Sequence, residues 1–431
     1  MNTASLTSLE QLAARRRFGM RPGLDTMRRL MAVLGDPQDA LPCLHIAGTN
    51  GKGSVAAMLD AVLRAAGYRV ARYTSPHLVA LNERFFVDGA PVSDHALAAA
   101  AERVMAAVHR LADEGADCEP TFFEALTAVA FVLFADLRPD VVVLETGLGG
   151  RLDATNLIRA PWASVVTRIG RDHCAWLGET LAAIAREKAG IIKPGCPVVC
   201  GAMPEEARAV VQAAAVAAGG DFTEAVPVAL PDGFALAGPF QRENAATVHA
   251  VLDVLARARK LTVSPTAWRD GLRRVVWPGR CQRIVRDGVT FWVDGAHNPD
   301  GARALAEALR AEGGAGPMGL VAGFCGDKES AAHLDVMRSC VTRGWAVPIA
   351  NDRSQTPAET AARMRAAGIP SEPCADVGTA LAQAEAWARA AGGTVVVCGS
   401  LFLVGEALTR LAAYPWTQLT PSPNEQTLSP A

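Results

Sequence analysis

The chain has 431 residues, half of them hydrophobic and 20% charged, so it is too long for one ordinary domain and too apolar to be disordered. Its 42 Lys and Arg residues nearly balance 44 Asp and Glu residues, and this balance lacks the basic excess of a nucleic-acid-binding protein. We therefore expect a two-domain α/β enzyme that binds small molecules.

Targeting and membrane signals are missing from the sequence. The uncharged run at 125–135 is shorter than the about 20 residues that a membrane span needs, and it predicts a buried helix. Arg15, Arg16 and Arg17 precede a polar stretch rather than the apolar segment of a secretory signal. The ten cysteines are scattered without metal-ligand spacing. We expect reduced thiols and a cytoplasmic protein without membrane contact.

Short β-rich runs alternate with Ala- and Leu-rich helical segments along the first half of the chain. This alternation predicts a mostly parallel sheet covered by helices. Strands are expected at 43–47, 69–73, 141–144, 163–167 and 198–200.

A second alternating block follows Pro278, with strands expected at 283–285, 290–293, 320–324, 346–349 and 394–398. Pro278 and Gly279 interrupt regular structure and mark the boundary between the two blocks. We predict an N-terminal domain at 1–277, a hinge at 278–285, a smaller Rossmann-like α/β domain at 286–414 and a disordered tail at 415–431.

A glycine-rich loop follows the first predicted strand, and a helix follows the loop. Closely spaced glycines let backbone N–H groups converge on phosphate oxygens, and a helix N-terminus adds a favourable dipole. The alternative is a glycine turn with a solvated lysine, and the loop departs from the common G-x-x-x-x-G-K-[ST] spacing. The context favours a P-loop-type mononucleotide-binding domain, with phosphate bound by Gly48, Thr49, Asn50, Gly51, Lys52, Gly53 and Ser54.

Several motifs along the chain resemble those of the folate-ligase branch of the Mur ligase family. They occur in the family's order between about Phe18 and Leu411. They are GTNGKGS at 48–54, SPHL at 75–78, ETGLGGRLDATN at 145–156, DHCAWLG at 172–178, QRENA at 241–245, PGR at 278–280, DGAHNP at 294–299 and CGS at 398–400.

This resemblance implies an ATP-dependent amide ligase of dihydrofolate and folylpolyglutamate synthesis. ATP would convert the carboxylate of dihydropteroate, or of a reduced folate, to an acyl phosphate, and L-glutamate would then attack it. The sequence lacks a G-x-S-x-G nucleophile elbow, which suits activation by ATP. Another Mur-type amino-acid ligase and a P-loop kinase are the alternatives. We expect a monomer.

The resemblance also implies roles for particular residues. Lys52, Lys188 and His297 would be catalytic, and Asn244, Arg280 and Asp294 would bind ATP beside the glycine loop. Two Mg²⁺ ions are implied, with a monovalent cation as a further candidate cofactor. The implied metal ligands are Ser75, Glu145, His173 and Lys188 as a carbamate.

Folate-binding and glutamate-binding positions follow from the same resemblance. Some of these residues have a simpler interpretation, because the phenylalanine pair could belong to the core and a lone lysine or histidine could lie on the surface. The implied substrate-binding residues are Met20, Arg21, Pro22, Thr121, Phe122, Phe123, Glu124, Leu152, Asp153, Ala154 and Ser400.

Overall fold

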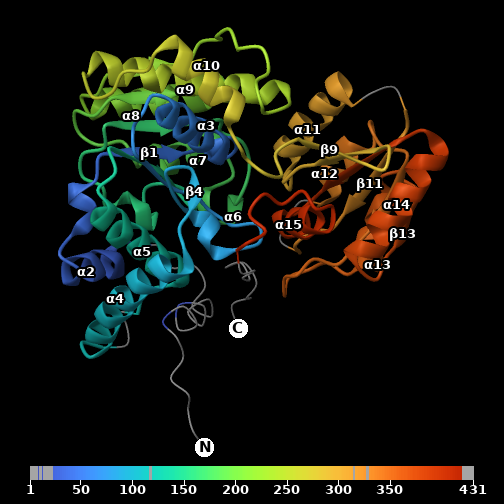
Figure 1. Ribbon diagram of the computed structural model, residues 1–431, viewed down its shortest axis with the longest axis horizontal. Helices are drawn as coiled ribbons and strands as arrows, with labels where there is room; N and C mark the ends of the chain where they lie inside the picture. Colours follow the sequence, from blue (N-terminus) through green and yellow to red (C-terminus); the bar gives the residue numbers. More distant parts are fainter. Residues whose placement is uncertain are drawn as a thin grey trace, which may run out of the picture.

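The computed structural model describes Ser8, Leu12 and residues 23–115, 119–313, 316–326 and 330–419. In this part of the chain two β-sheets lie side by side, each with its own helices (Figure 1). Met20, Arg21 and Pro22 lie outside the described residues.

The first sheet contains eight strands: β1 (Cys43–Ala47), β2 (Val70–Tyr73), β3 (Phe85–Val87), β4 (Ala90–Pro91), β5 (Val141–Glu145), β6 (Ala163–Val166), β7 (Val198–Cys200) and β8 (Phe222–Glu224). Their order is β4-β3-β2-β5-β1-β6-β7-β8. All neighbours are parallel except at β3, which runs antiparallel to both β2 and β4. Pro91 lies on the edge strand β4, where its missing N–H costs no ladder bond.

Helices cover both faces of this sheet, and alternate strand residues point into two cores. Val142 and Leu144 face α2, α4 and α5, whereas Val141 and Val143 face α3, α9 and α10. The strands are apolar on both faces, as buried parallel strands must be. The helices are α2 (Asp25–Val33), α3 (Lys52–Ala65), α4 (Asp94–Ala112), α5 (Phe122–Leu137), α6 (Cys174–Leu177), α7 (Leu181–Ala189), α8 (Glu205–Ala217), α9 (Pro239–Arg257) and α10 (Pro265–Arg274).

The second sheet has six strands in the order β13-β12-β11-β14-β10-β9, and only β9 is antiparallel to its neighbour. Its strands are β9 (Gln282–Arg286), β10 (Val289–Val293), β11 (Met318–Ala322), β12 (Arg343–Ala346), β13 (Ser371–Pro373) and β14 (Thr394–Cys398). The helices packed on it are α11 (Pro299–Glu312), α12 (Ser330–Met337), α13 (Pro357–Ala366), α14 (Val377–Ala391) and α15 (Leu401–Arg410).

The predicted fold class is confirmed, but two strand positions were wrong. The strands expected at 320–324 and 346–349 begin two or three residues earlier, at Met318 and Arg343. Gly319 and Gly344 resemble breaks in the sequence but lie within the strands. A Cβ at Gly319 would lie 2.7 Å from the Trp345 ring, so glycine makes room for that side chain.

The two domains touch at several places besides the connecting chain. Leu78 and Val79, which follow β2, pack against the core of the second domain. The Tyr414 hydroxyl donates to Glu83 Oε1 at 2.7 Å, and the Trp416 ring packs edge-on against Phe86. Packing therefore continues to Trp416, two residues past the predicted end of the second domain at 414.

The carboxyl ends of the central strands of both sheets lie at a cavity that the two domains share. Loops after β1, β5 and β6 of the first sheet, and after β10 and β14 of the second, line one shared cavity. Ligands of open α/β sheets bind at such edges. No helix among the described residues is long and apolar enough to cross a bilayer.

Candidate active site between the two domains

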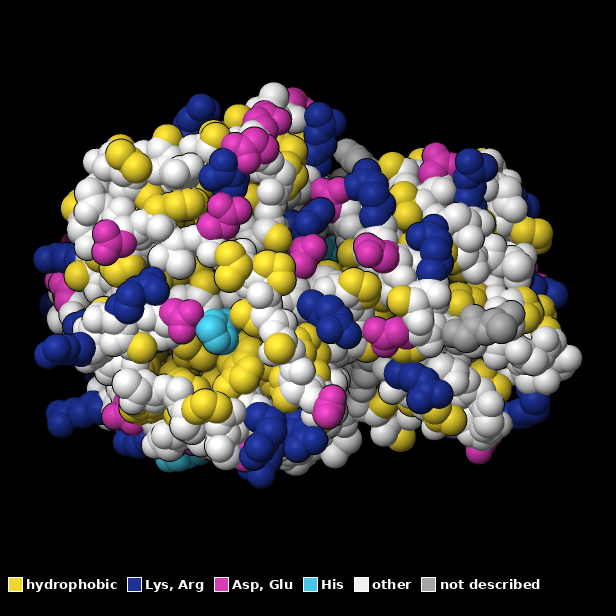
Figure 2. Space-filling model, turned by 90° about the horizontal axis from the view of Figure 1, so that it is seen from above, with side chains coloured by type: hydrophobic (Ala, Val, Ile, Leu, Met, Phe, Trp, Pro, Cys, Tyr) yellow, Lys and Arg dark blue, Asp and Glu magenta, His cyan; other side chains and the backbone are white. Residues whose placement is uncertain are grey.

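A cavity of about 360 Å³ lies between the domains. Its lining includes all seven residues of the glycine loop together with residues of both domains. On the face shown in Figure 2, basic and acidic side chains are interspersed, without a large patch of either sign. Among the predicted residues the cavity brings together Gly48, Thr49, Asn50, Gly51, Lys52, Gly53, Ser54, Ser75, Glu145, His173, Lys188, Asn244, Arg280, Asp294, His297 and Ser400.

The glycine loop connects β1 to α3 and is held by neighbouring segments. Gly51 is the N-cap of α3 with φ +91°, and a Cβ there would lie 2.4 Å from Asn244 Oδ1. The Thr49 N–H donates to the Arg168 carbonyl at 2.9 Å. The loop is thus pre-shaped by contacts that leave no room for side chains at its glycines, and the N-terminus of α3 lies at the cavity.

Two lysines converge on one carbonyl of this loop. Lys52 Nζ and Lys188 Nζ donate to the Gly48 carbonyl oxygen at 3.1 and 2.8 Å. Lys188 is buried, and this burial together with the Lys52 charge lowers its pKa to about 7, against the opposing effect of Asp172 and Asp153. Lys188 is therefore not the surface lysine that the simpler interpretation allowed.

Glu145 ends β5 as a buried carboxylate. Its Oε2 accepts the Ser75 N–H at 3.2 Å, and its Oε1 lies 4.0 Å from Lys52 Nζ. Burial raises the pKa of Glu145, and the charges of Lys52 and Arg280 oppose that rise.

The donor set near Glu145 fits magnesium. No group of three or more His, Cys, Asp or Glu side chains that could hold a metal occurs within the described residues. Mg²⁺ usually takes one or two carboxylates and completes its shell with phosphate oxygens and water. Glu145 and the Ser75 hydroxyl are therefore adequate for an ion shared with a nucleotide.

The hinge and the second domain contribute a half-buried arginine, a buried carboxylate and a buried serine. Asp294 follows β10, and its oxygens accept the N–H groups of Cys281 and Ala296, both at 2.7 Å. Burial lowers the pKa of Arg280, although the charges of Asp294 and Glu145 favour its cation. Ser400 caps α15 through its hydroxyl.

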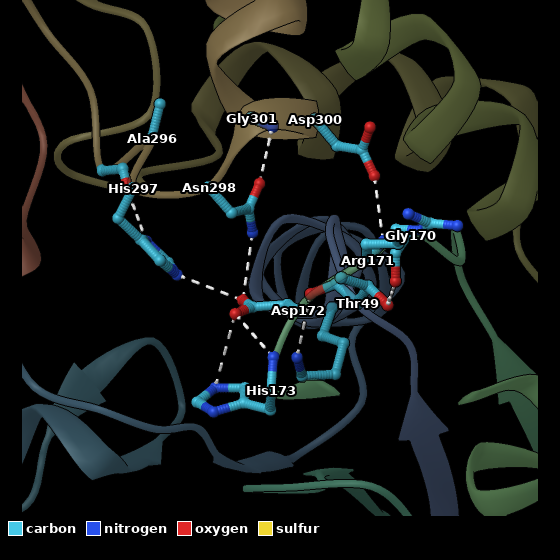
Figure 3. Close-up of polar contacts among 12 residues, drawn as sticks. Thr49, Gly170, Arg171, Asp172, His173, Ala296, His297, Asn298, Asp300 and Gly301 are labelled. Atoms are coloured by element: carbon cyan, nitrogen blue, oxygen red, sulfur yellow. Dashed lines mark hydrogen bonds and ion pairs between the residues drawn. The ribbon is translucent and has the colours of Figure 1, made fainter. Parts of the chain in front are cut away.

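Asp172 connects this side of the cavity to the first domain. It contacts the backbone of His173 and the side chains of His297 and Asn298 (Figure 3). The sequence indicated an Asp-His pair after a strand, but a single sequence carries no signal that the aspartate faces a loop over 120 residues away.

The predicted folate-binding residues do not line this cavity, and their contact with folate stays a prediction. Thr121 and Glu124 form a capping box at the start of α5. Asp153 accepts the N–H groups of Gly147 and Leu148, both at 2.9 Å. Phe122 is in the core, as the simpler interpretation expected for one of the pair, and Phe123 is half-buried. Leu152 and Ala154 flank Asp153.

Sequence reasoning missed the contacts that support the loop from behind. Gln241 Nε2 donates to the Ser54 hydroxyl at 3.2 Å, and Gln241 Oε1 accepts from Asn244. The Trp277 ring lies where a Cβ on Gly53 would fall, with its nearest carbon 2.4 Å away. These contacts join segments distant in sequence, so no local pattern reveals them.

Two α/β domains close one cavity over a glycine phosphate loop, and this arrangement fits a nucleotide-dependent ligase of the Mur type. A family model described as Mur ligase, glutamate ligase domain, matches residues 279–401. A dihydrofolate synthase/folylpolyglutamate synthase of Bacillus subtilis (strain 168) is 38% identical over 334 residues, which cover 72% of this chain and 77% of the relative.

Two solved structures share the whole fold. E. coli FolC in complex with DHPP and ADP has a TM-score of 0.83 and 32% identity, with 96% of this chain and 99% of that chain covered. A bifunctional folylpolyglutamate synthase/dihydrofolate synthase with Mn, AMPPNP and L-glutamate bound has a TM-score of 0.81 and 30% identity, with 95% and 99% covered. The chain belongs to the dihydrofolate synthase/folylpolyglutamate synthase family of ATP-dependent ligases.

Proposed function

We propose that this ligase joins L-glutamate to dihydropteroate, giving dihydrofolate, and to reduced folates, giving polyglutamates. The observation that carries the proposal is the cavity itself, in which the glycine loop, Glu145, Arg280 of the hinge and His297 of the second domain face one space. FolC binds DHPP and ADP, and a second relative binds AMPPNP and L-glutamate. A nucleotide and the amine L-glutamate are thus both ligands of relatives, which supports the proposal.

The reaction begins when the substrate carboxylate attacks the γ-phosphorus of ATP and ADP leaves. The loop N–H groups and the Lys52 ammonium hold the phosphates, so their charge is offset where it develops. The glutamate amine then attacks the acyl carbon, phosphate leaves, and the amine loses a proton as the amide forms. Replacing Lys52 with Ala should lower turnover at least about 100-fold.

Magnesium belongs beside Glu145 and Ser75, with His173 as a third ligand. There it would neutralise phosphate charge as the phosphoryl group moves. The relative that binds AMPPNP also holds Mn, which supports a divalent ion at this place. A monovalent cation is a further part of the proposal.

Lys188 is the residue we assign to carbamylation. A carbamate forms from a neutral amine and CO₂ with loss of one proton, so the reaction needs a lysine whose charged form is disfavoured. Lys188 is buried between α7 and the glycine loop, and the charge of Lys52 lies nearby. Both burial and this like charge disfavour the ammonium form of Lys188. The new carboxylate would hold a second magnesium ion.

The second domain completes the site and keeps water from the acyl phosphate. In this scheme His297 lies nearest the acyl phosphate, Arg280, Asp294 and Asn244 hold the nucleotide, and Ser400 orients glutamate. The pterin end reaches the region of Phe123, which offers an aromatic face. The remaining folate contacts are Met20, Arg21, Pro22, Thr121, Phe122, Glu124, Leu152, Asp153 and Ala154.

We further propose a monomer that works in the cytoplasm. Both halves of the cavity come from one chain, which supports a monomer. The nine cysteines in the described residues all carry free thiols, as expected in a reducing compartment.

A product assay tests the function. Purified protein with ATP, magnesium, dihydropteroate and L-glutamate should yield dihydrofolate, ADP and phosphate, and tetrahydrofolate should replace dihydropteroate. Sustained ADP release should require both the acid and the amine. Release with either one alone would indicate a kinase or an ATPase, and absence of product would refute the proposal.

A further inference from the structure

The carboxylate of Asp172 divides its two oxygens between the domains (Figure 3). Oδ1 accepts the backbone N–H of His173 at 2.9 Å, on the first domain. Oδ2 accepts from Asn298 Nδ2 at 3.0 Å and lies 3.4 Å from His297 Nε2, on the second domain. The Asp172 side chain is only 13% exposed, so water competes weakly for these contacts.

The partners of Asp172 are themselves held in fixed orientations. His297 Nδ1 lies 2.7 Å from the Gly295 carbonyl oxygen, so oxygen acceptors face both ring nitrogens. Asn298 Oδ1 accepts the Gly301 N–H at 2.7 Å as the N-cap of α11, and this leaves its NH₂ group for Asp172. Each group therefore has one contact within its own domain and one with Asp172.

The two residues before Asp172 extend the same connection. The Thr49 hydroxyl of the glycine loop donates to the Gly170 carbonyl at 3.0 Å. The Arg171 N–H donates to Asp300 Oδ2 at 3.1 Å. The segment 170–172 therefore joins the phosphate loop directly to the N-terminus of α11.

We infer that Asp172 is a positioning residue for ligation: it sets the His297 ring of the second domain against the phosphate and metal groups of the first. The inference rests on the proposed function. Asp172 need not touch ATP or folate in this role. Because it acts on the geometry of the assembled site, its loss should affect turnover more than nucleotide affinity.

Asparagine cannot replace Asp172, although it has nearly the same shape. If the oxygen of the new amide faced the His173 N–H, the new NH₂ group would meet the NH₂ group of Asn298. If the new amide were flipped, its NH₂ group would meet the His173 N–H. One domain loses its acceptor in either case.

The first experiment compares Asp172→Asn with Glu312→Gln. Glu312 Oε1 also accepts a backbone N–H across the domains, from Gly238 at 2.9 Å, but it lies outside the cavity lining and glutamine can keep that bond. Asp172→Asn should lower kcat about 100-fold and leave the KM for ATP within about three-fold. Glu312→Gln should match the wild type.

Two results of this comparison would overturn the inference. One is a kcat for Asp172→Asn within about three-fold of the wild type. The other is an equal loss in Glu312→Gln, which would mark a general effect of weaker docking.

The double variant Asp172→Asn with Asn298→Asp separates the two contacts. The new amide at position 172 can donate to the new carboxylate at position 298, and that carboxylate still accepts the Gly301 N–H, so docking is restored. The ring of His297 then faces an amide NH₂ group instead of a carboxylate. Stability should recover while kcat stays low, and recovery of kcat as well would overturn the role assigned to His297.

Hydrogen exchange of segment 295–301 tests the same idea without turnover. Exchange should be faster in Asp172→Asn than in Glu312→Gln, and equal rates would contradict the inference. Because this measurement needs no substrate, its result tests the inference even if the product assay removes the proposed function.

Discussion

Lys188 donates a hydrogen bond to the Gly48 carbonyl oxygen at 2.8 Å, which connects the last turn of α7 to the first residue of the phosphate loop. Lys52 donates to the same oxygen. Two lysine side chains therefore face one carbonyl at the place where phosphate is expected. This arrangement explains why Lys188 has a lowered pKa, since burial and a like charge both disfavour its ammonium form.

Replacing Lys188 with Ala should abolish most activity, by at least about 100-fold, because the carbamate and its metal ion are lost. Short carboxylates such as acetate should partly restore turnover by occupying the space. Labelled ¹³C-bicarbonate should give a carbamate resonance in the wild type but not in the variant. Full activity in Lys188→Ala would refute the assignment.

Replacing Gly51 with Ala should weaken ATP binding. The left-handed backbone at φ +91° costs alanine about 1 kcal/mol, and the new Cβ would also collide with Asn244 Oδ1. Gly67 is the matched control, because it has φ +90° with open space around its Cβ position. Both variants should lose stability through the left-handed backbone, Gly51→Ala the more because of the collision with Asn244, and only Gly51→Ala should raise the Kd for an ATP analogue, measured by calorimetry. Equal affinities would argue against a role for this contact.

Tyr414→Phe should loosen the contact between the domains. The lost bond reaches a buried carboxylate that also accepts the N–H groups of Leu78, Val79 and Ala80. Bonds to charged groups contribute about 1.5–3 kcal/mol, so urea unfolding should show a loss in that range.

Tyr68→Phe is the control for that variant, since its hydroxyl donates to the Thr262 carbonyl on an exposed part of the first domain. Its cost should be at most about 1 kcal/mol. An equal loss of stability in both variants would mean that the bond from Tyr414 to Glu83 contributes no more than an exposed hydrogen bond.

Acid should destabilise the protein through two buried histidines. Burial lowers the pKa of His45 and of His333 from 6.5 to about 3. Below pH 6.5 the unfolded chain binds these protons and the folded chain does not, so stability is complete above pH 6.5 and falls as the pH drops toward 3. Each histidine should lower the free energy of unfolding by about 1.4 kcal/mol when the pH falls from 7.5 to 5.5.

Denaturant unfolding at these two pH values measures the effect. In His45→Gln and His333→Gln the difference between pH 7.5 and 5.5 should shrink by about 1.4 kcal/mol each. An unchanged difference in both variants would show that the folded protein takes up these protons.

The sequence predicted the sheet, the glycine loop and Glu145 because each depends on local pattern. Val141–Glu145 is an apolar run with one acid at its end, and that acid lies in the cavity. The structure was needed where contacts cross the chain. Asp172 accepts a hydrogen bond from Asn298, 126 positions away, and no periodicity encodes that pairing.

The local sequence pattern also misplaced two strands, in which glycines make room for neighbouring side chains. Gly319 and Gly344 lie beneath Trp345 and Met364. The sequence shows the absence of their side chains but not the ring or sulfur atom that occupies the space.

Transfer of ¹⁸O tests the central claim most directly. Dihydropteroate labelled with ¹⁸O in its carboxylate is incubated with the enzyme, ATP, magnesium and L-glutamate, and the released phosphate is analysed by mass spectrometry. An acyl-phosphate ligase must move one carboxylate oxygen to each phosphate as the amide forms, so labelled phosphate should match dihydrofolate mole for mole. Dihydrofolate formed together with unlabelled phosphate would contradict the account.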